Sequence, residues 1–196
     1  MLEQLDRSRL IGVLFVLATY WTLVLSSEFI RRTWMTVPGS EALIMCFLAF
    51  LSSLAWLAFL MAFLPRTIAL FLIVLAALAS SAANVFCFEY DSTVSAETLA
   101  FISGMNGAVA LEMASGIAIF WITLSFLPVL LWTFMIPESW SFETRLYLFG
   151  IGVVATLIAC GLCLTVIPEI AWRIDEWDRL WELFTPTNLI KASVTG

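Results

Sequence analysis

Residues 42–64 read ALIMCFLAFLSSLAWLAFLMAFL, a run that contains no charged side chain. A helix needs about 20 apolar residues to cross the hydrocarbon core of a bilayer. The run is continuously apolar and does not alternate with polar residues, which favours a helix over a strand of a membrane barrel. This stretch therefore predicts a transmembrane helix.

Four further apolar runs resemble it, and apolar residues make up 62% of the chain, whereas a soluble domain is about half apolar. The five predicted spans are Leu10–Ser27, Ala42–Leu64, Ile68–Phe88, Gly116–Ile136 and Leu146–Ile167. The first is expected to be an uncleaved anchor, because residues 25–28 form a poor signal-cleavage site. The sequence thus predicts an all-α integral membrane bundle of five transmembrane helices, with interfacial amphipathic helices added to it.

The segments that connect the predicted spans differ in length between the two sides of the bundle. Pro65–Thr67 joins spans two and three in what is expected to be a tight antiparallel hairpin, and Pro137–Arg145 joins spans four and five on the same side. The longer segments Glu28–Glu41 and Glu89–Glu112, and the tail from Pro168, fall on the other side. Because loops held by a rigid scaffold often carry function, the side with the long segments is expected to be the functional one.

The tail divides the chain into a transmembrane domain, residues 1–167, and an interfacial segment, residues 168–196. Its apolar side chains recur at helical spacing and define one face: Ile170, Ile174, Trp177, Trp181 and Phe184. Because Trp favours the headgroup level, this helix is expected to lie flat on the membrane. Its net acidity is unusual for such a helix, so docking against another protein is the alternative. The predicted docking residues are Trp172, Trp177, Trp181 and Phe184. A weaker interfacial helix is predicted around Ser95–Met105.

The net charge of −6 comes from acids outside the spans, and no basic patch is present, which argues against nucleic acid as a partner. The positive-inside rule gives nearly equal counts on the two sides. One side holds Arg7, Arg9, Arg66 and Arg145, and the other holds Arg31, Arg32, Arg173, Arg179 and Lys191. Charge alone therefore does not orient the chain.

Residues that usually carry chemistry are scarce in this sequence. No predicted span has an ionisable residue in its middle, which counts against an ion-coupled transporter. The absence of His removes the usual general base and the commonest zinc ligand. The pair Cys160 and Cys163 has no His or acid nearby and is interpreted as helix packing, so no metal, cofactor or disulfide is predicted.

Small residues recur every four positions in the third span, at Ala76, Ser80 and Asn84. This spacing lets helices approach closely, so packing is the preferred interpretation. Asn84 is the exception, because it is expected near the membrane surface beside the acidic loop that follows.

Taken together, these features resemble the N-terminal membrane domain of bacterial lipid A phosphoethanolamine transferases. The resemblance lies in five spans, a short hairpin between the second and third spans, a longer loop after the third span and an interfacial helix that leads out of the fifth. Residues 80–90, SSAANVFCFEY, are similar to the family's small-residue run followed by Phe and Tyr, and residues 183–188, LFTPTN, are similar to its Pro-Ser/Thr-Asn segment.

The resemblance implies a site for the donor lipid, phosphatidylethanolamine, in the third loop. The family uses an Asn, a Thr and a Glu there. One alignment places Thr93 and Glu97 on the Thr and Glu, with Glu89 in place of the Asn, and another places Asn106 on the Asn. The four residues Glu89, Thr93, Glu97 and Asn106 are the predicted headgroup-binding set.

The resemblance also implies a location, the bacterial inner membrane, with a cytoplasmic N-terminus and with the long loops and tail in the periplasm. The family's catalytic zinc domain would begin near Gly196, so this chain alone is expected not to be an enzyme. Its expected function is a membrane anchor that binds phosphatidylethanolamine, with membrane phospholipid as its partner. The alternative is an accessory subunit of a larger membrane complex, which would dock on other membrane proteins through its spans and tail. A small transporter is the third hypothesis.

Overall fold

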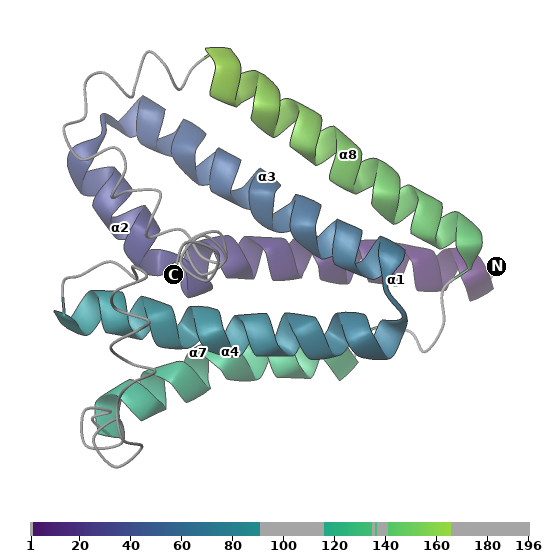
Figure 1. The fold of residues 1–196 in the computed structure, drawn as a ribbon, viewed down its shortest axis with the longest axis horizontal. Helices are drawn as coiled ribbons and strands as arrows, with labels where there is room; N and C mark the ends of the chain where they lie inside the picture. The colour runs from purple at the N-terminus through teal and green to yellow at the C-terminus, as the bar shows by residue number, and fades with distance from the viewer. Residues whose placement is uncertain (1, 91–115, 135, 137–140, 166–196) are drawn as a thin grey trace, which may run out of the picture.

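A computed structural model describes residues 2–90, 116–134, 136 and 141–165 of the protein (Figure 1). These residues form helices and the short turns between them, so the prediction of an all-helical chain is confirmed for this part. Four of its helical segments are long and apolar enough to cross a membrane. They are Arg7–Leu25, Gly39–Phe63, Arg66–Val85 and Phe142–Thr165.

The first span is longer than predicted and leads into a helix that the sequence did not indicate. Helix α1 (Leu2–Tyr20) continues as the π-helix η1 (Trp21–Leu25), and Ser26 then leaves the helical region with φ −119° and ψ 30°. Helix α2 (Ser27–Thr36) follows at a steep angle to α1 (Figure 1). The segment Glu28–Glu41, predicted to be a loop, is therefore mostly helical.

Helices α3 (Gly39–Phe63) and α4 (Arg66–Tyr90) run antiparallel from a turn at Leu64 and Pro65, as predicted. They do not form a tightly packed hairpin, however. They diverge from the shared turn in Figure 1, and α3 packs mainly against α8 (Phe142–Thr165) and α1. The reason is that α1 and η1 supply the apolar side chains that α3 and α4 both bury.

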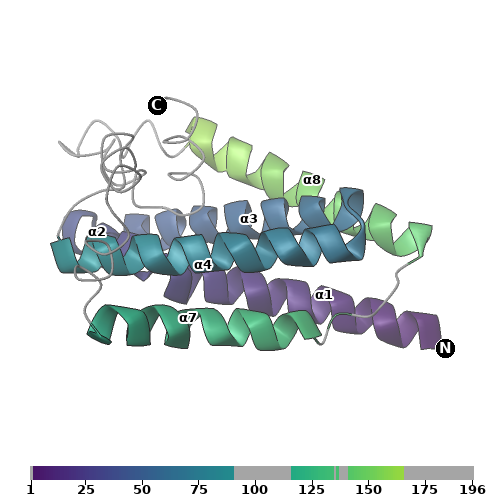
Figure 2. The ribbon, with the colours of Figure 1, turned by 60° about the horizontal axis from the view of Figure 1, so that its bottom comes forward.

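Helix α7 (Gly116–Phe134) packs along α4, and Figure 2 shows the two helices side by side. It continues through Pro128, which removes the N–H partner of one backbone carbonyl in the preceding turn. In that turn the Tyr20 hydroxyl donates a 2.8 Å hydrogen bond to the carbonyl of Ser125. This hydrogen bond joins the residue that precedes η1 to α7 beside the proline, while the carbonyl that loses its N–H partner is that of Leu124.

The main core is built around one face of α1 and η1. Leu10, Leu14, Leu17 and Trp21 recur at helical spacing and are all fully buried. The Trp21 ring meets Trp56 of α3 edge-on, with ring centroids 4.7 Å apart. A second, smaller cluster joins α2, α3 and α4 through Phe29, Met45, Leu48, Ala49, Ala83 and Cys87.

Two arginines hold the end of the bundle where the short turns lie. Arg145 of α8 donates to the carbonyls of Ala62 and Leu64, each at 3.4 Å, and these carbonyls belong to the end of α3. Arg66 of α4 donates to the carbonyl of Ile136, just beyond α7, at 3.1 Å. Helix ends leave carbonyls without partners, and a cation there also offsets the helix dipole. The contacts confirm that both turns lie at one end.

The cysteine pair of α8 does not pack against another helix. Cys160 and Cys163 are exposed free thiols, so their interpretation as packing residues is wrong for the described part of the chain. The reason is that α8 turns only one face toward α3, and both cysteines lie off that face.

The contact between α3 and α8 depends on a glycine. A Cβ atom at Gly152 would lie 2.8 Å from Cε1 of Phe59, whereas a Cβ at Gly161 of the same helix meets nothing within 4 Å. We expect Gly152→Val to lower the unfolding free energy by about 1–3 kcal/mol through overpacking. Gly161→Val, which makes the same change in an open position, is the control. Thermal unfolding in detergent measures both, and equal midpoints would show that this contact does not limit stability.

Candidate functional site

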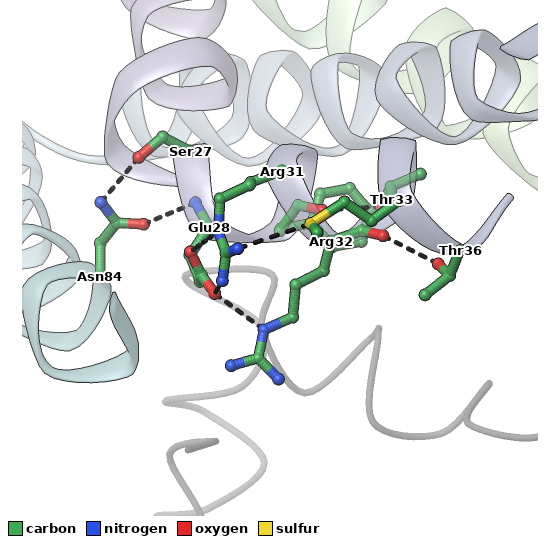
Figure 3. Close-up of polar contacts among 9 residues, drawn as sticks. Ser27, Glu28, Arg31, Arg32, Thr33, Thr36 and Asn84 are labelled. Carbon is green, nitrogen blue, oxygen red and sulfur yellow. Dashed lines mark hydrogen bonds and ion pairs between the residues drawn. The ribbon is translucent and has the colours of Figure 1, made fainter. Parts of the chain in front are cut away.

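A buried carboxylate lies at the end of the bundle opposite the short turns. The Glu28 side chain is 2% exposed and accepts hydrogen bonds from two arginines (Figure 3). Arg31 binds it with both Nε and Nη2, at 2.8 and 2.6 Å, and Arg32 binds it with Nε at 2.7 Å. The pairing follows from helical geometry, because residues three and four apart lie on one face of α2. The two-point contact with Arg31 is the strong form of this interaction.

Asn84 of α4 forms hydrogen bonds with the first turn of α2. Its Oδ1 accepts the backbone N–H of Glu28, and its Nδ2 donates to Oγ of Ser27, both at 2.9 Å (Figure 3). The first N–H groups of a helix have no partner within the helix, and the residue before α2, Ser26, makes no side-chain cap. Asn84 therefore acts as the cap of α2 across a distance of 56 residues in the sequence.

Arg31 connects this cluster to the outer surface of α4. Its guanidinium carbon lies 6.0 Å from the centroid of the Phe88 ring, within the range of a cation–π contact, and its Nη1 donates to Sδ of Met35 at 3.5 Å. Contacts on three sides thus fix the guanidinium: the Glu28 carboxylate, the Met35 sulfur and the Phe88 ring.

The environment keeps Glu28 ionised. Burial alone would raise the pKa of its carboxyl, but the hydrogen bonds and positive charges of Arg31 and Arg32 outweigh burial, so the pKa lies below its ordinary value. The cluster therefore contains two guanidinium groups and one carboxylate near neutral pH.

A pocket of about 360 Å³ borders the cluster. Its lining comes from η1, α2, α4 and α7: Leu23, Val24, Ser27, Asn84, Val85, Phe88, Trp121 and Ser125. Most of this lining is apolar, while Ser27, Asn84 and Ser125 contribute polar atoms. Asn84 and Phe88 belong to the pocket wall and also contact the cluster. A mostly apolar pocket with a few convergent polar groups is the usual form of a site for a small, largely apolar ligand.

The arrangement is suited to binding and offers no metal site. Within residues 2–90, 116–134 and 141–165, no group of three or more His, Cys, Asp or Glu side chains could hold a metal ion. Arginine guanidinium groups match the geometry of phosphate oxygens and stay charged at any physiological pH. The chemistry that the site offers is therefore recognition of a phosphate or a similar anion.

The sequence predicts that function lies at this end of the bundle, but the cluster itself is seen only in the structure. Asn84 was singled out, and the structure gives it two hydrogen bonds that hold α2. Glu28, Arg31 and Arg32 were considered only as flanking charges, although their spacing at i, i+3 and i+4 is the signal of a helical ion pair.

Of the predicted headgroup-binding set, Glu89 lies in the last turn of α4, and its side chain is not described. The other predicted residues lie outside the described part of the chain: Thr93, Glu97 and Asn106, and the docking set Trp172, Trp177, Trp181 and Phe184.

Comparison of the chain with protein-family models, with curated proteins and with solved structures finds no match. The resemblance to phosphoethanolamine transferases accordingly stays a prediction.

The lowered pKa of Glu28 gives the stability of the cluster a defined dependence on pH. A carboxyl whose pKa is lowered by folding contributes stability above its unfolded pKa, about 4.3, and loses it as pH falls through the folded pKa. We expect Glu28→Gln to be less stable than the unchanged protein at pH 7, and this difference to shrink below about pH 4. Thermal unfolding midpoints measured from pH 7 to pH 3 test this. A difference that stays constant down to pH 3 would contradict the assigned ion pairs.

The capping role of Asn84 predicts a separate loss. We expect Asn84→Ala to lower stability by about 1–2 kcal/mol, the range for losing a helix cap, and to increase hydrogen exchange of the α2 amides. Thr36→Ala is the control, because Thr36 is exposed on the same helix and its hydroxyl donates only to the carbonyl of Arg32. If exchange in α2 rises equally in both variants, Asn84 does not hold the helix start.

Proposed function

We propose that this chain is a five-span membrane protein that binds the headgroup of a phospholipid at the end of the bundle where α2 lies. The observation that carries the proposal is that two guanidinium groups, held on one face of α2, lie beside a mostly apolar pocket. A phospholipid has the complementary form, because its phosphate is anionic and its acyl chains are apolar.

The fifth span in this proposal is α7. It has 19 residues, which at about 1.5 Å per residue gives a length of about 28 Å, close to the roughly 30 Å thickness of the hydrocarbon core. Its described side chains are mostly apolar, and it packs along α4, which is long enough to span. Adding α7 to the four longer helical segments gives five spans and puts α2 and the C-terminal end of α8 on the same side.

The phosphate would lie against Arg31 and Arg32, and the acyl chains would run along the pocket and the surface of Phe88 and Trp121. Both rings are largely exposed, with 66% and 52% of their surface accessible. Aromatic side chains at the ends of membrane spans favour the headgroup level. The contact between the Arg31 guanidinium and Phe88 places the positive charge directly above this apolar surface.

The likeness to phosphoethanolamine transferases supports an anchoring role and an orientation. In that role the chain would hold a phosphatidylethanolamine at the periplasmic face of a bacterial inner membrane, with its N-terminus in the cytoplasm. The catalytic step would belong to another domain or protein, because the described residues supply a binding site and no nucleophile with an activating base.

The test is native mass spectrometry of the protein released from nanodiscs of defined phospholipid composition. We expect the double variant Arg31→Ala, Arg32→Ala to retain phospholipid at least about tenfold less well, since the loss of one charged hydrogen bond, about 1.5–3 kcal/mol, corresponds to tenfold or more. Arg9→Ala, which removes an exposed cation at the opposite end, controls for the general loss of charge.

A second variant separates binding from folding. Glu28→Gln removes the anion of the cluster and leaves both arginines, so phospholipid retention should stay the same or increase even though the protein is less stable. Equal retention in the unchanged protein and in the double arginine variant would refute the proposed site. Reduced retention in Glu28→Gln would show that the cluster acts through folding alone.

A further inference from the structure

A second hollow lies on the flank of the bundle, between α1, α3 and α8. It is an open groove with a volume of about 1000 Å³, at the upper end of the range of roughly 300–1,000 Å³ that is usual for ligand pockets. Phe15 of α1, Phe50 and Leu54 of α3, and Val154 and Ile158 of α8 are among its lining residues. Figure 2 shows α8 lying across α3, with the N-terminal ends of α8 and α1 at the same end of the bundle.

The groove has charge at one end only. There Glu143 of α8 accepts a 2.7 Å ion pair from Nη2 of Arg7, and the Arg7 guanidinium carbon lies 4.6 Å from the centroid of the Tyr147 ring. The Glu143 side chain is 74% exposed, so its carboxylate is accessible. The Nε–H of Arg7 is buried and has no hydrogen-bond partner among the described residues. The mouth of the groove therefore presents one cation and one anion side by side.

The length of the groove corresponds to one leaflet of a bilayer. On α8 the lining runs from Glu143 to Ile158, about 22 Å of helix at about 1.5 Å per residue. Half of a hydrocarbon core is about 15 Å, and one headgroup layer adds about 5–8 Å. A transmembrane helix from a partner would instead need a continuous apolar track through both leaflets, about 30 Å, with no charged pair inside it.

We propose that this groove binds one diacyl phospholipid with a zwitterionic, amine-bearing headgroup, in the leaflet opposite the α2 end. The phosphate lies on Arg7, the ammonium group lies on the Glu143 carboxylate, and the two acyl chains fill the groove between the aromatic side chains of α1 and α3 and the aliphatic side chains of α8. This site shares no residue with the pocket beside Glu28, and the inference does not depend on the function proposed there.

A glycine in the groove provides the test. Gly150 lines it, and a Cβ atom added there meets nothing within 4 Å, so a larger side chain enters the groove without a clash. Gly150→Leu should fill part of the groove, while Gly161→Leu makes the same change at an equally open position of α8 outside it. Both substitutions raise helix propensity to the same extent, so folding does not distinguish them.

The measurement is native mass spectrometry from nanodiscs that contain equal amounts of phosphatidylethanolamine and phosphatidylglycerol. We expect the unchanged protein and Gly161→Leu to retain one more phosphatidylethanolamine than Gly150→Leu. Glu143→Gln should keep a phospholipid in the groove but lose the preference for ethanolamine over glycerol headgroups by about tenfold.

Three results would overturn the inference. One is identical lipid retention in Gly150→Leu and Gly161→Leu. Another is a change of oligomeric state, or loss of a co-purified protein, in Gly150→Leu without a change in lipid, which would assign the groove to a second copy or to a partner helix. The third is an unchanged headgroup preference in Glu143→Gln. The Arg31 and Arg32 variants test the pocket at the other end of the bundle. Either proposal can therefore be refuted while the other stands.

Discussion

The bundle depends on the apolar face that α1 and η1 present to the other helices. Its side chains at helical spacing, from Leu10 to Leu25, belong to one continuous core with side chains of α3, α4 and α8. In a bilayer, lipid is as apolar as the side chains, so helices associate through close packing and hydrogen bonds more than through exclusion of water. Fully buried large residues such as Leu14 and Trp21 supply that packing, while α7 and α8 attach to the outside of α4 and α3.

Polar interactions at the two ends of the bundle differ in their structural roles. At the end with the short turns, Arg66 and Arg145 bind backbone carbonyls and so close the helix ends. At the α2 end, two arginines bind one buried carboxylate. Removing one partner of a buried ion pair is costly, whereas the pair itself contributes little net stability. The Glu28 pairs therefore add little net stability, although losing one of the partners is costly.

The long helices were predictable because run length and apolar composition are local properties of the sequence. Helix α2 was not predictable in this way, since it is short and polar, and Asn84 of a different helix caps its first turn. The arrangement of α3 and α4 was missed for a similar reason. A short connection fixes their direction but not which neighbours each helix packs against.

In the candidate site, too, the features set by neighbouring residues were predictable, whereas the contacts between distant segments were not. The spacing of Glu28, Arg31 and Arg32 was visible in the sequence, but the contact of Arg31 with Phe88 depends on how α2 and α4 meet. The groove along α8 was not predictable at all, because Arg7 and Glu143, which form its charged end, are 136 residues apart.

The π-helix gives this chain an unequal tolerance to two kinds of mutation. A π turn contains one residue more than the α-helical turn it replaces, and each residue of an α-helix advances by about 100° around the axis. Deleting one residue within η1 (Trp21–Leu25) would let a regular α-helical turn complete the same rotation, so Glu28 would stay opposite Asn84. Deleting one residue from the regular part of α1 would instead rotate the core face of α1 by about 100° relative to α2. The π turn thus marks a stretch in which the helix can lose a residue without moving α2 relative to the rest of the bundle.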